Sequence, residues 1–394
     1  TSQSEDEKPD RPNFVFIYAD DLGYGDLGCF GARDIETPNL DGMAENGIQF
    51  TSFYSASPVS SPSRAALMTG RYPQRMGINA VFFPESYTGM PVDEITVADE
   101  LKEEGYTTGI IGKWHLGHRH EFLPLQRGFD EYFGIPYSND MESVVYMEGN
   151  KVVDFHVDQH YITKTYTEKS LDFIDRHHQS PFFLYIAHNM PHVPIYASEE
   201  FVGTSKRGLY GDVIQELDWS VGQVIAKLKE HNILENTLIV FSSDNGPWLI
   251  MEQFGGSAGP LREGKQYTFE GGQRVPTLAM WKGNIPAGQV YEGMATMMDW
   301  FPTFISLAGG KGPNDRVIDG ENISQVLFGK GKRNGNSFLY FMLDDYRAYR
   351  QGPWKIKKPF PGFPGNSWTK GVEAHPALLI NLEEDMGEQH NLAA

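Results

Sequence analysis

The sequence predicts a layered α/β fold with a large, mixed but mostly parallel central sheet and a small antiparallel sheet near the C-terminus. Continuous apolar runs at residues 13–19, 181–187 and 237–242 are typical of strands that are buried on both faces. Segments with helical spacing alternate with these runs, which indicates a parallel sheet covered by helices. After residue 328 the pattern changes to short alternating apolar pieces, as in antiparallel strands.

The remaining elements can be placed in chain order. Residues 38–46, 62–69, 95–104, 169–177 and 211–230 are predicted helices, and residues 49–54 and 107–111 are predicted strands. A proline in the first turn and a glycine beyond the last residue fit the second of these helices. We expect a solvated, disordered tail at residues 1–10, a main domain at 11–328, a Gly-rich linker at 329–336, and a small subdomain at 337–394 with strands at 337–342, 346–350 and 354–357.

The composition excludes several classes of protein. The chain has 394 residues, with 52 acidic residues against 33 Lys and Arg, so its net charge of −19 argues against a nucleic-acid partner. An anionic substrate would need a local group of positive charges. The single cysteine, Cys29, excludes an intrachain disulfide and a cysteine zinc site.

Apolar runs such as residues 182–187 are far shorter than the roughly 20 residues of a membrane span, so we expect none. The first ten residues carry no signal sequence. We expect an exported protein, periplasmic or extracellular and of bacterial origin, from which a signal peptide has been removed.

Polar pairs follow two of the predicted buried strands. Asp20 and Asp21 end the first strand, and Asp244 and Asn245 follow the strand at residues 237–242. Ligands of open α/β sheets bind at the carboxyl ends of the strands, and an all-oxygen donor set suits Ca²⁺ or Mg²⁺. Asp and Asn are also common turn formers. However, adjacent buried carboxylates are costly without a metal or a cationic partner, which favours a site.

The segment SSPSRAALMTGR at residues 60–71 is the most informative in the chain. It places a Ser-rich turn and Arg64 at the start of a helix, where an anion is favoured. Position by position it also matches the sulfatase signature. The chain resembles the arylsulfatase-type sulfatases of the alkaline phosphatase superfamily, the arylsulfatase A-like branch above all. Further matching blocks are NFVFIYADDLGYGDLGCFG, TGIIGKWHLG, FSSDNGP and GKQYTFEGGQRVP, so the resemblance covers nearly the whole chain.

The resemblance implies an alkaline phosphatase-like α/β/α catalytic domain and a specific nucleophile. Ser60 occupies the position that a formylglycine-generating or sulfatase-maturating enzyme oxidises to Cα-formylglycine. One hydroxyl of the hydrated aldehyde attacks sulfur, and the second hydroxyl allows sulfate to be expelled. An ordinary serine ester lacks this second hydroxyl. Asp20, Asp21, Asp244 and Asn245 match the residues that bind the family's single Ca²⁺, and the residue at position 60 completes the set of ligands.

The same resemblance implies roles for further residues. Arg64 would hold the nucleophile and the metal site, and Lys113 and Lys265 would bind the sulfate. His115 would lie near the second oxygen of the nucleophile, and His192 would donate a proton to the leaving alcohol. Without the resemblance, Lys113 and His115 would equally fit a loop around a buried Trp, and Lys265 an exposed loop.

The substrate-binding residues are read from local composition. The cluster of His118, Arg119 and His120 either lines a pocket for a polyanionic glycan or lies in a solvated loop. Trp248 is expected to overhang the crevice and stack on a sugar. We also expect three residues of the small subdomain to face the site, namely Arg347, Arg350 and Trp354. We therefore expect Ca²⁺-dependent hydrolysis of a sulfate ester on a carbohydrate, with a galactose-based glycan as the narrower hypothesis.

Three alternatives stay open at this point. Many family members carry Cys where this chain has Ser60, and serine-type sulfatases occur in bacteria, but an engineered Cys replacement would give the same sequence. With Ser60 unmodified, the chain would be a non-catalytic glycan-binding protein. A phosphoester or phosphonate hydrolase of the same superfamily is the third alternative, although the second set of Asp and His ligands that two-metal phosphatases need is not evident.

Overall fold

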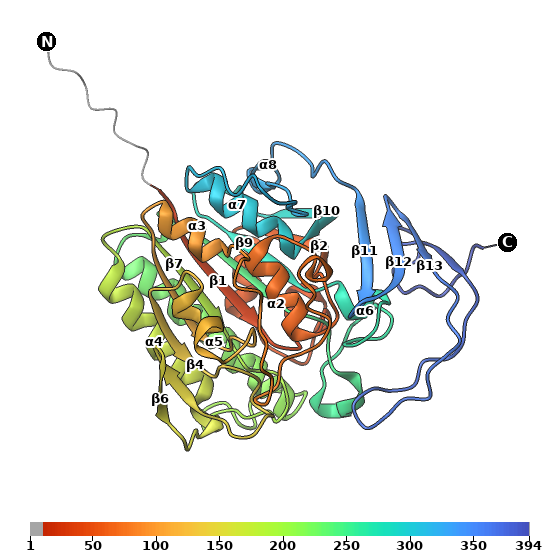
Figure 1. Cartoon of the computed structure of the whole chain (residues 1–394), viewed down its shortest axis with the longest axis horizontal. Helices are drawn as coiled ribbons and strands as arrows, with labels where there is room; N and C mark the ends of the chain where they lie inside the picture. The colour runs from red at the N-terminus through yellow and green to blue at the C-terminus, as the bar shows by residue number, and fades with distance from the viewer. Residues whose placement is uncertain (1–10, 394) are drawn as a thin grey trace, which may run out of the picture.

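The computed structural model describes residues 11–393, and the predicted tail at residues 1–10 lies outside them. Most strands belong to one large sheet (Figure 1). Its members are β1 (Asn13–Ala19), β2 (Ile48–Tyr54), β3 (Thr107–Gly112), β4 (Glu131–Gly134), β5 (Tyr146–Glu148), β6 (Lys151–Asp154), β7 (Phe182–Ala187), β8 (Thr237–Ser243), β9 (Thr277–Met280) and β10 (Gln289–Thr296). The strand order across the sheet is β10-β2-β9-β8-β1-β7-β3-β4-β5-β6.

The large sheet is mixed, as predicted, with its parallel strands at the centre. β1 lies between β7 and β8 and is parallel to both, and β3 is parallel to β7 and β4. β10 is parallel to β2, whereas β9 runs antiparallel between β2 and β8. The short β5 and β6 form an antiparallel edge. The central parallel strands bring their carboxyl ends to one edge, where the polar pairs were predicted to meet.

Helices cover both faces of this sheet. They are α1 (Pro38–Glu45), α2 (Ser60–Thr69), α3 (Val97–Glu103), α4 (Ile162–His177), α5 (Leu209–Glu230), α6 (Glu270–Gln273), α7 (Trp300–Leu307) and α8 (Ser324–Leu327). Because side chains alternate along a strand, Phe14 and Phe16 of β1 pack with α2, α3 and α7, whereas Val15 and Ile17 pack with α1, α4 and α5. This confirms the predicted layered architecture.

Short 3₁₀ helices complete the connections, at Gly28–Phe30, Pro73–Met76, His120–Phe122, Pro124–Gln126, Gln159–Tyr161, Leu234–Asn236, Leu249–Phe254 and Met297–Asp299. The predicted elements lie where the sequence placed them, with two notable extensions. α2 begins at Ser60 rather than residue 62, and α4 begins at Ile162 rather than residue 169. The first shift matters for function because it places Ser60 in the first turn of a helix.

A second, antiparallel sheet is formed by β11 (Ser337–Met342), β12 (Asp345–Gln351), β13 (Trp354–Lys357) and β14 (Leu378–Asn381). Figure 1 shows it beside the large sheet. Phe338 and Tyr340 of β11 pack on Tyr54 at the end of β2. The small sheet was predicted, except for β14. The division of the chain into domains at residues 328 and 337 stays a prediction.

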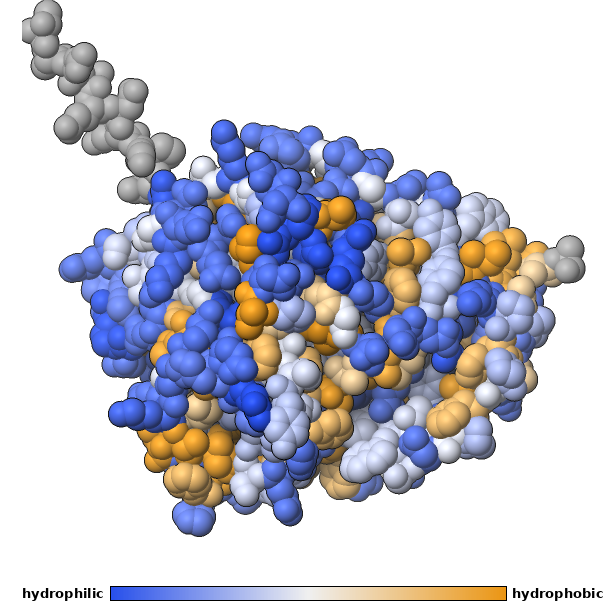
Figure 2. Space-filling view, in the orientation of Figure 1, coloured by the Kyte–Doolittle hydropathy of each residue, from blue (hydrophilic) through white to orange (hydrophobic). Residues whose placement is uncertain are grey.

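Polar residues dominate the visible surface. The face in Figure 2 is largely hydrophilic, with small separate hydrophobic areas. No helix within residues 11–393 is both long enough and apolar enough to cross a bilayer.

Candidate active site

The two predicted polar pairs meet at the carboxyl ends of β1 and β8. These strands pair in register up to Ala19 and Ser243, so the next residues of each strand are neighbours. The Asp21 amide donates to Asp244 Oδ1 at 3.0 Å, and Asn245 Nδ2 donates to Asp21 Oδ1 at 2.8 Å. All members are buried. Asp21 also has a positive φ of 64°, a strained conformation that is common at functional sites.

The N-terminus of α2 brings Ser60 and Arg64 to this edge. Arg64 Nε donates to Ser60 Oγ at 2.8 Å, and its Nη2 lies 3.0 Å from Asp244 Oδ2 and 3.5 Å from Asp20 Oδ1. Burial lowers the pKa of this guanidinium, but Asp244 and Asp20 outweigh burial and raise it. Arg64 therefore stays charged and joins the serine to two of the carboxylates.

His115 contacts the serine from the opposite side. Its Nε2 lies 2.7 Å from the Phe82 carbonyl oxygen, which can only accept, so Nε2 carries the hydrogen. Nδ1 is then free to accept from the Ser60 hydroxyl at 3.0 Å. Burial, followed by Lys113 and Arg64, lowers the pKa of His115 well below its ordinary value. A neutral imidazole with an open nitrogen on Ser60 is the arrangement of a general base.

Two lysines and a second histidine complete the cluster. Lys113 Nζ contacts Asp20 Oδ2 at 2.6 Å, and Lys265 Nζ contacts Asp21 Oδ2 at 2.9 Å. Burial lowers the pKa of Lys113, and Asp20 offsets only part of that effect. His192 Nδ1 donates to the Val193 carbonyl at 2.5 Å, which leaves Nε2 directed towards Asp21 Oδ2, 3.6 Å away. The structure thus brings together all the predicted catalytic and metal-binding residues.

The oxygen atoms of this cluster fit a hard cation. Asp20 Oδ1 and Asn245 Oδ1 are buried and have no hydrogen-bond partner among the described residues. Burial and the neighbouring Asp20 raise the pKa of Asp244, so Arg64 and Lys113 do not fully offset the cost of ionising this carboxyl. Carboxylate and amide oxygens that lie close together without hydrogen-bond partners are the ligands that Ca²⁺ or Mg²⁺ binds. Asp20, Asp21 and His192 also lie close enough to share an ion.

A cavity of about 550 Å³ opens over Ser60. Lys113, His115, His192 and Lys265 line its floor, and Trp248 lines its wall, as predicted. Trp248 stacks with Trp368 at 6.3 Å between ring centroids, and its Nε1 donates to the Trp368 carbonyl at 3.0 Å. The loop before β14 therefore reaches the cavity from the small subdomain.

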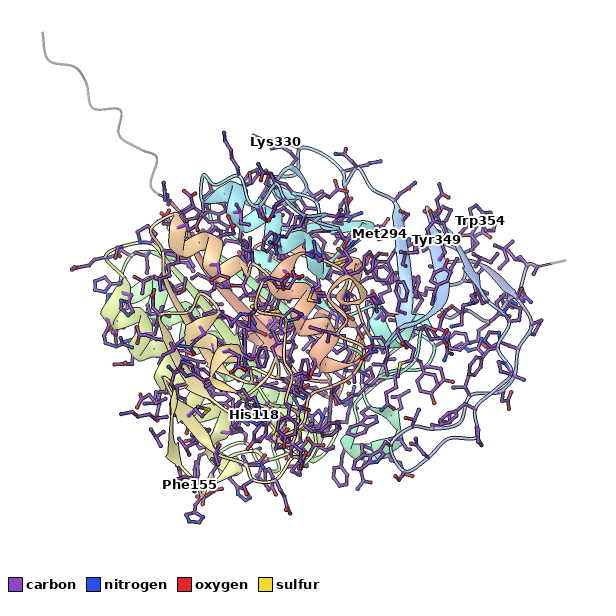
Figure 3. All side chains as sticks on the ribbon, viewed as in Figure 1. His118, Phe155, Met294, Lys330, Tyr349 and Trp354 are labelled. Carbon is purple, nitrogen blue, oxygen red and sulfur yellow. The ribbon has the colours of Figure 1, made fainter. Side chains whose placement is uncertain are left out.

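Other predicted substrate residues lie elsewhere. His118, Arg119 and His120 are not among the described residues that line the cavity, and Arg119 stacks on Tyr87 instead. Figure 3 places His118 in the main domain, far from Trp354 on the small sheet. Trp354 lies outside the cavity wall, and Arg350 donates to the Tyr54 hydroxyl at 2.6 Å. Both were expected to face the site, and the packing of the small sheet on β2 explains why they do not.

Arg347 also lines no part of this cavity. It borders a second, adjacent cavity of about 240 Å³. Its role in substrate binding stays a prediction.

Sequence reasoning missed Asp140, Glu142 and Trp368, which also line the cavity. Burial acts to raise the pKa of Asp140, but His192 and Lys113 hold it below its ordinary value. The two acidic residues lie in a polar loop that follows β4, another strand ending at this edge, and that position was the available signal. Trp368 had no local signal beyond being an aromatic residue in a Pro/Gly-rich loop.

Fold and site together define a hydrolase of anionic esters, with an all-oxygen cation site and a serine at a helix N-terminus between a guanidinium and an imidazole. The chain belongs to the sulfatase family, whose model, described as Sulfatase, matches residues 12–310. It is accordingly a sulfuric ester hydrolase.

Relatives resemble the chain over nearly its full length. N-acetylgalactosamine-6-sulfatase of Mus musculus is 42% identical over 98% of this chain and 82% of its own length. Arylsulfatase A of Bos taurus is 38% identical over 97% of this chain and 83% of its own length. A solved sulfatase structure, described under the metabolism of multiple glycosaminoglycans by Bacteroides thetaiotaomicron, superposes with a TM-score of 0.90. It is 29% identical and covers 97% of this chain and 95% of its own.

Proposed function

We propose that this protein hydrolyses a sulfate ester on a carbohydrate, with formylglycine derived from Ser60 as the nucleophile and one bound Ca²⁺. The observation that carries the proposal is the pair of contacts at Ser60 Oγ, which lies 3.0 Å from His115 Nδ1 and 2.8 Å from Arg64 Nε. A hydrated aldehyde at this position would supply one hydroxyl to attack sulfur and a second to release sulfate. His115, neutral and with Nδ1 open, accepts the proton of the hydroxyl beside it.

The charges at the floor of the cavity suit a sulfate group. Lys113, Lys265 and Arg64 are buried cations beside Ser60, and burial strengthens their stabilisation of negative charge. Asp20, Asp21, Asp244 and Asn245 would hold Ca²⁺, which polarises sulfate oxygens when it is bound. His192 lines the cavity, and with both ring nitrogens protonated it would donate the proton of Nε2 to the leaving sugar oxygen while Nδ1 keeps its bond to the Val193 carbonyl.

The walls of the cavity support a sugar as the leaving group. Trp368, which is 59% exposed and stacks with Trp248, offers aromatic area of the kind on which sugar rings pack. A volume of about 550 Å³ accepts more than a sulfate group. Asp140 and Glu142 are acceptors for hydroxyl groups and would repel a second anion at that point. The mouse relative's name supports a galactose-type sugar, with N-acetylgalactosamine 6-sulfate as the first candidate.

The position of Ser60 bears on its maturation. The residue is only 3% exposed, in the first turn of α2 beneath the cavity. An enzyme that oxidises serine to formylglycine would therefore have to act before this part of the chain folds. We propose such a maturation enzyme as a partner, and export from the cell as the setting in which a glycan-degrading enzyme meets its substrate.

Mass spectrometry of the Ser60 peptide tests the nucleophile, because oxidation to formylglycine removes two hydrogens. An active preparation whose peptide is entirely unmodified would refute the mechanism. Turnover of sulfated galactose-type sugars is then compared with turnover of the matching phosphate esters, each with and without Ca²⁺. Phosphate turnover far above sulfate turnover would overturn the proposed reaction, and binding of sulfated sugar without any turnover would indicate a glycan-binding protein.

A further inference from the structure

The second cavity, of about 240 Å³, adjoins the catalytic one. Gln266 and Met342 line both cavities, and Trp368 of the first is followed in the chain by Thr369 of the second. The second cavity lies between the segment that follows Lys265 and the small subdomain, with Arg347, Lys357 and His375 on its walls. None of the described residues that line it is acidic, although the protein as a whole carries a net charge of −19.

Lys357 is the unusual residue in this cavity. Its side chain is buried, with 3% exposed, yet no carboxylate of the described residues lies within 4.0 Å of its ammonium group. Its contacts are the Thr268 hydroxyl at 2.5 Å and the face of Phe269, whose centroid is 4.3 Å away. Burial, followed by the neighbouring Lys355, lowers the pKa of Lys357 to about 7. A buried charge without a counter-charge is costly, and an anion in the cavity would stabilise the charged form of this lysine.

Lys355, two residues earlier on β13, shows what a structural lysine looks like in the same region. It is equally buried, and its Nζ lies 3.0 Å from Glu270 Oε2 and 2.9 Å from Glu388 Oε2. The nearby acidic groups are thus already paired with Lys355. Lys357 is left to face the cavity.

The remaining walls extend the positive field. The Arg347 guanidinium lies 4.3 Å from the centroid of Phe360, and its Nε donates to Asp345 Oδ2. Stacking on an aromatic ring holds a guanidinium in a fixed orientation, so that its Nη groups can bind an oxyanion while Nε bonds to Asp345.

We propose that this cavity is an anion-binding subsite that takes a carboxylate or sulfate on the sugar residue next to the one that loses its sulfate. The inference rests on the proposed function, because it requires the catalytic cavity to hold a sulfated sugar. A glycan whose sulfated residue packs on Trp368 would then extend past Gln266 and Met342, with its next anionic group against Lys357 and Arg347. The subsite would select oligosaccharides over monosaccharides.

Binding to the Ser60→Ala protein tests the subsite without turnover. Calorimetry would compare three sulfated disaccharides whose neighbouring sugar carries a carboxylate, a sulfate or only hydroxyl groups. We expect one or both anionic forms to bind about ten- to a hundredfold more tightly than the neutral form, as for charge-assisted hydrogen bonds. The disaccharide that binds more tightly than the neutral form shows whether the subsite takes a carboxylate or a sulfate. Equal affinities, or no binding at all, would overturn the subsite.

Added to Ser60→Ala, Lys357→Met and Arg347→Gln should each remove most of that preference and leave the affinity for a sulfated monosaccharide unchanged. Lys358→Met is the matched control, because Lys358 is exposed and lies outside the cavity. If Lys357→Met lowers the affinity for the monosaccharide as much as the affinity for the anionic disaccharide, the residue has only a structural role and the proposal is wrong. Turnover of the same sugars by wild-type protein is measured separately. A sulfatase without the subsite would turn the sugars over but show no preference for the anionic forms, whereas a glycan-binding protein would bind them without turnover.

Discussion

Two groups of buried charged and polar residues differ in how completely their hydrogen-bonding atoms are satisfied. The strand-end cluster consists of Asp20, Asp21, Asp244, Asn245, Arg64, Lys113 and Lys265. The interface cluster, between the main domain and the small sheet, consists of Glu270, Glu388, Lys355, Arg274, Arg350, Tyr54 and Tyr340. In the first, Asp20 Oδ1, Asn245 Oδ1 and Arg64 Nη1 lack hydrogen-bond partners among the described residues. In the second, Glu270 accepts from Tyr54, from Tyr340 at 2.8 Å and from Lys355 at 3.0 Å. Glu388 Oε2 has no hydrogen-bond partner among the described residues, but it lies 2.9 Å from Lys355 Nζ.

The pKa shifts show the same contrast. Burial and Asp20 raise the pKa of Asp244, so ionising this carboxyl within the strand-end cluster is unfavourable. Burial also acts to raise the pKa of Glu270, but Lys355, Arg274 and Arg350 lower it to about 2. The protein's own cations therefore offset the burial of Glu270 but not that of Asp244. The contrast holds for these two carboxylates, since burial acts to raise the pKa of Asp20 but Lys113, His192 and Arg64 lower it, and burial raises the pKa of Glu388. Substitutions should therefore affect activity in the first cluster and stability in the second.

The largest effect is expected for Ser60→Ala at the strand-end cluster. Removing the nucleophile should lower kcat for a sulfated sugar by about a million-fold, to the background rate. Thermal unfolding should change little, because the serine contributes only two hydrogen bonds. The control is Ser337→Ala, an exposed serine of β11. Residual turnover above one part in a hundred would show that Ser60 is not the nucleophile.

Glu270→Gln should produce the largest change in stability. Loss of one partner from a buried charge network costs about 3–5 kcal/mol, since Lys355 would keep its charge with less compensation. Urea unfolding of the variant and of Glu292→Gln, an exposed glutamate, measures the difference. A loss below about 1 kcal/mol, the range of an exposed pair, would contradict the assignment of Glu270 to a structural network.

The same carboxylate should make stability depend on acid pH. The folded pKa of Glu270, about 2, lies below its ordinary value of 4.5. Its contribution is therefore fully present above pH 4.5 and is lost as the pH falls from there towards 2. Accordingly, the difference in unfolding free energy between wild type and Glu270→Gln should shrink as the pH is lowered below 4.5. A difference that grows in acid would contradict this sign.

Calcium should act on the strand-end cluster alone. An ion that binds only the folded state raises the unfolding free energy by about 2.7 kcal/mol at a hundredfold excess over its Kd. We expect Ca²⁺ to raise the Tm of the wild type and a chelator to reverse the shift. Asp244→Asn should largely abolish the shift, and Glu270→Gln should retain it. An equal shift in both variants would place the ion elsewhere.

Trp368→Ala should have the smallest effect and change only substrate binding. An aromatic contact beyond simple burial contributes about 0.5–1.5 kcal/mol, so KM for a sulfated sugar should rise about two- to tenfold with kcat nearly constant. Trp368 is 59% exposed, so stability should be retained. Trp354→Ala, at a 45% exposed Trp outside the cavity, is the control. An equal rise in both variants would contradict the assignment of Trp368.

The sequence determined the central strands and the catalytic residues, because both are written in local patterns. Uninterrupted apolar runs predicted β1, β7 and β8, and the polar pairs after β1 and β8 lie together as expected. The segment that begins at Ser60 identified the helix N-terminus and the family. These features depend on residues that are adjacent in the chain or at the ends of neighbouring parallel strands.

Only the tertiary structure decided which charges are paired and which loops form the walls. On β13, Lys355 and Lys357 are buried whereas Trp354 and Ile356 are exposed, the reverse of what their polarity predicts. The fate of each lysine depends on whether Glu270 and Glu388, distant in sequence, reach it. Asp140 and Trp368 likewise reach the cavity through packing between segments far apart in the chain. Burial of a charge is set by its partners in space, and a local pattern does not contain them.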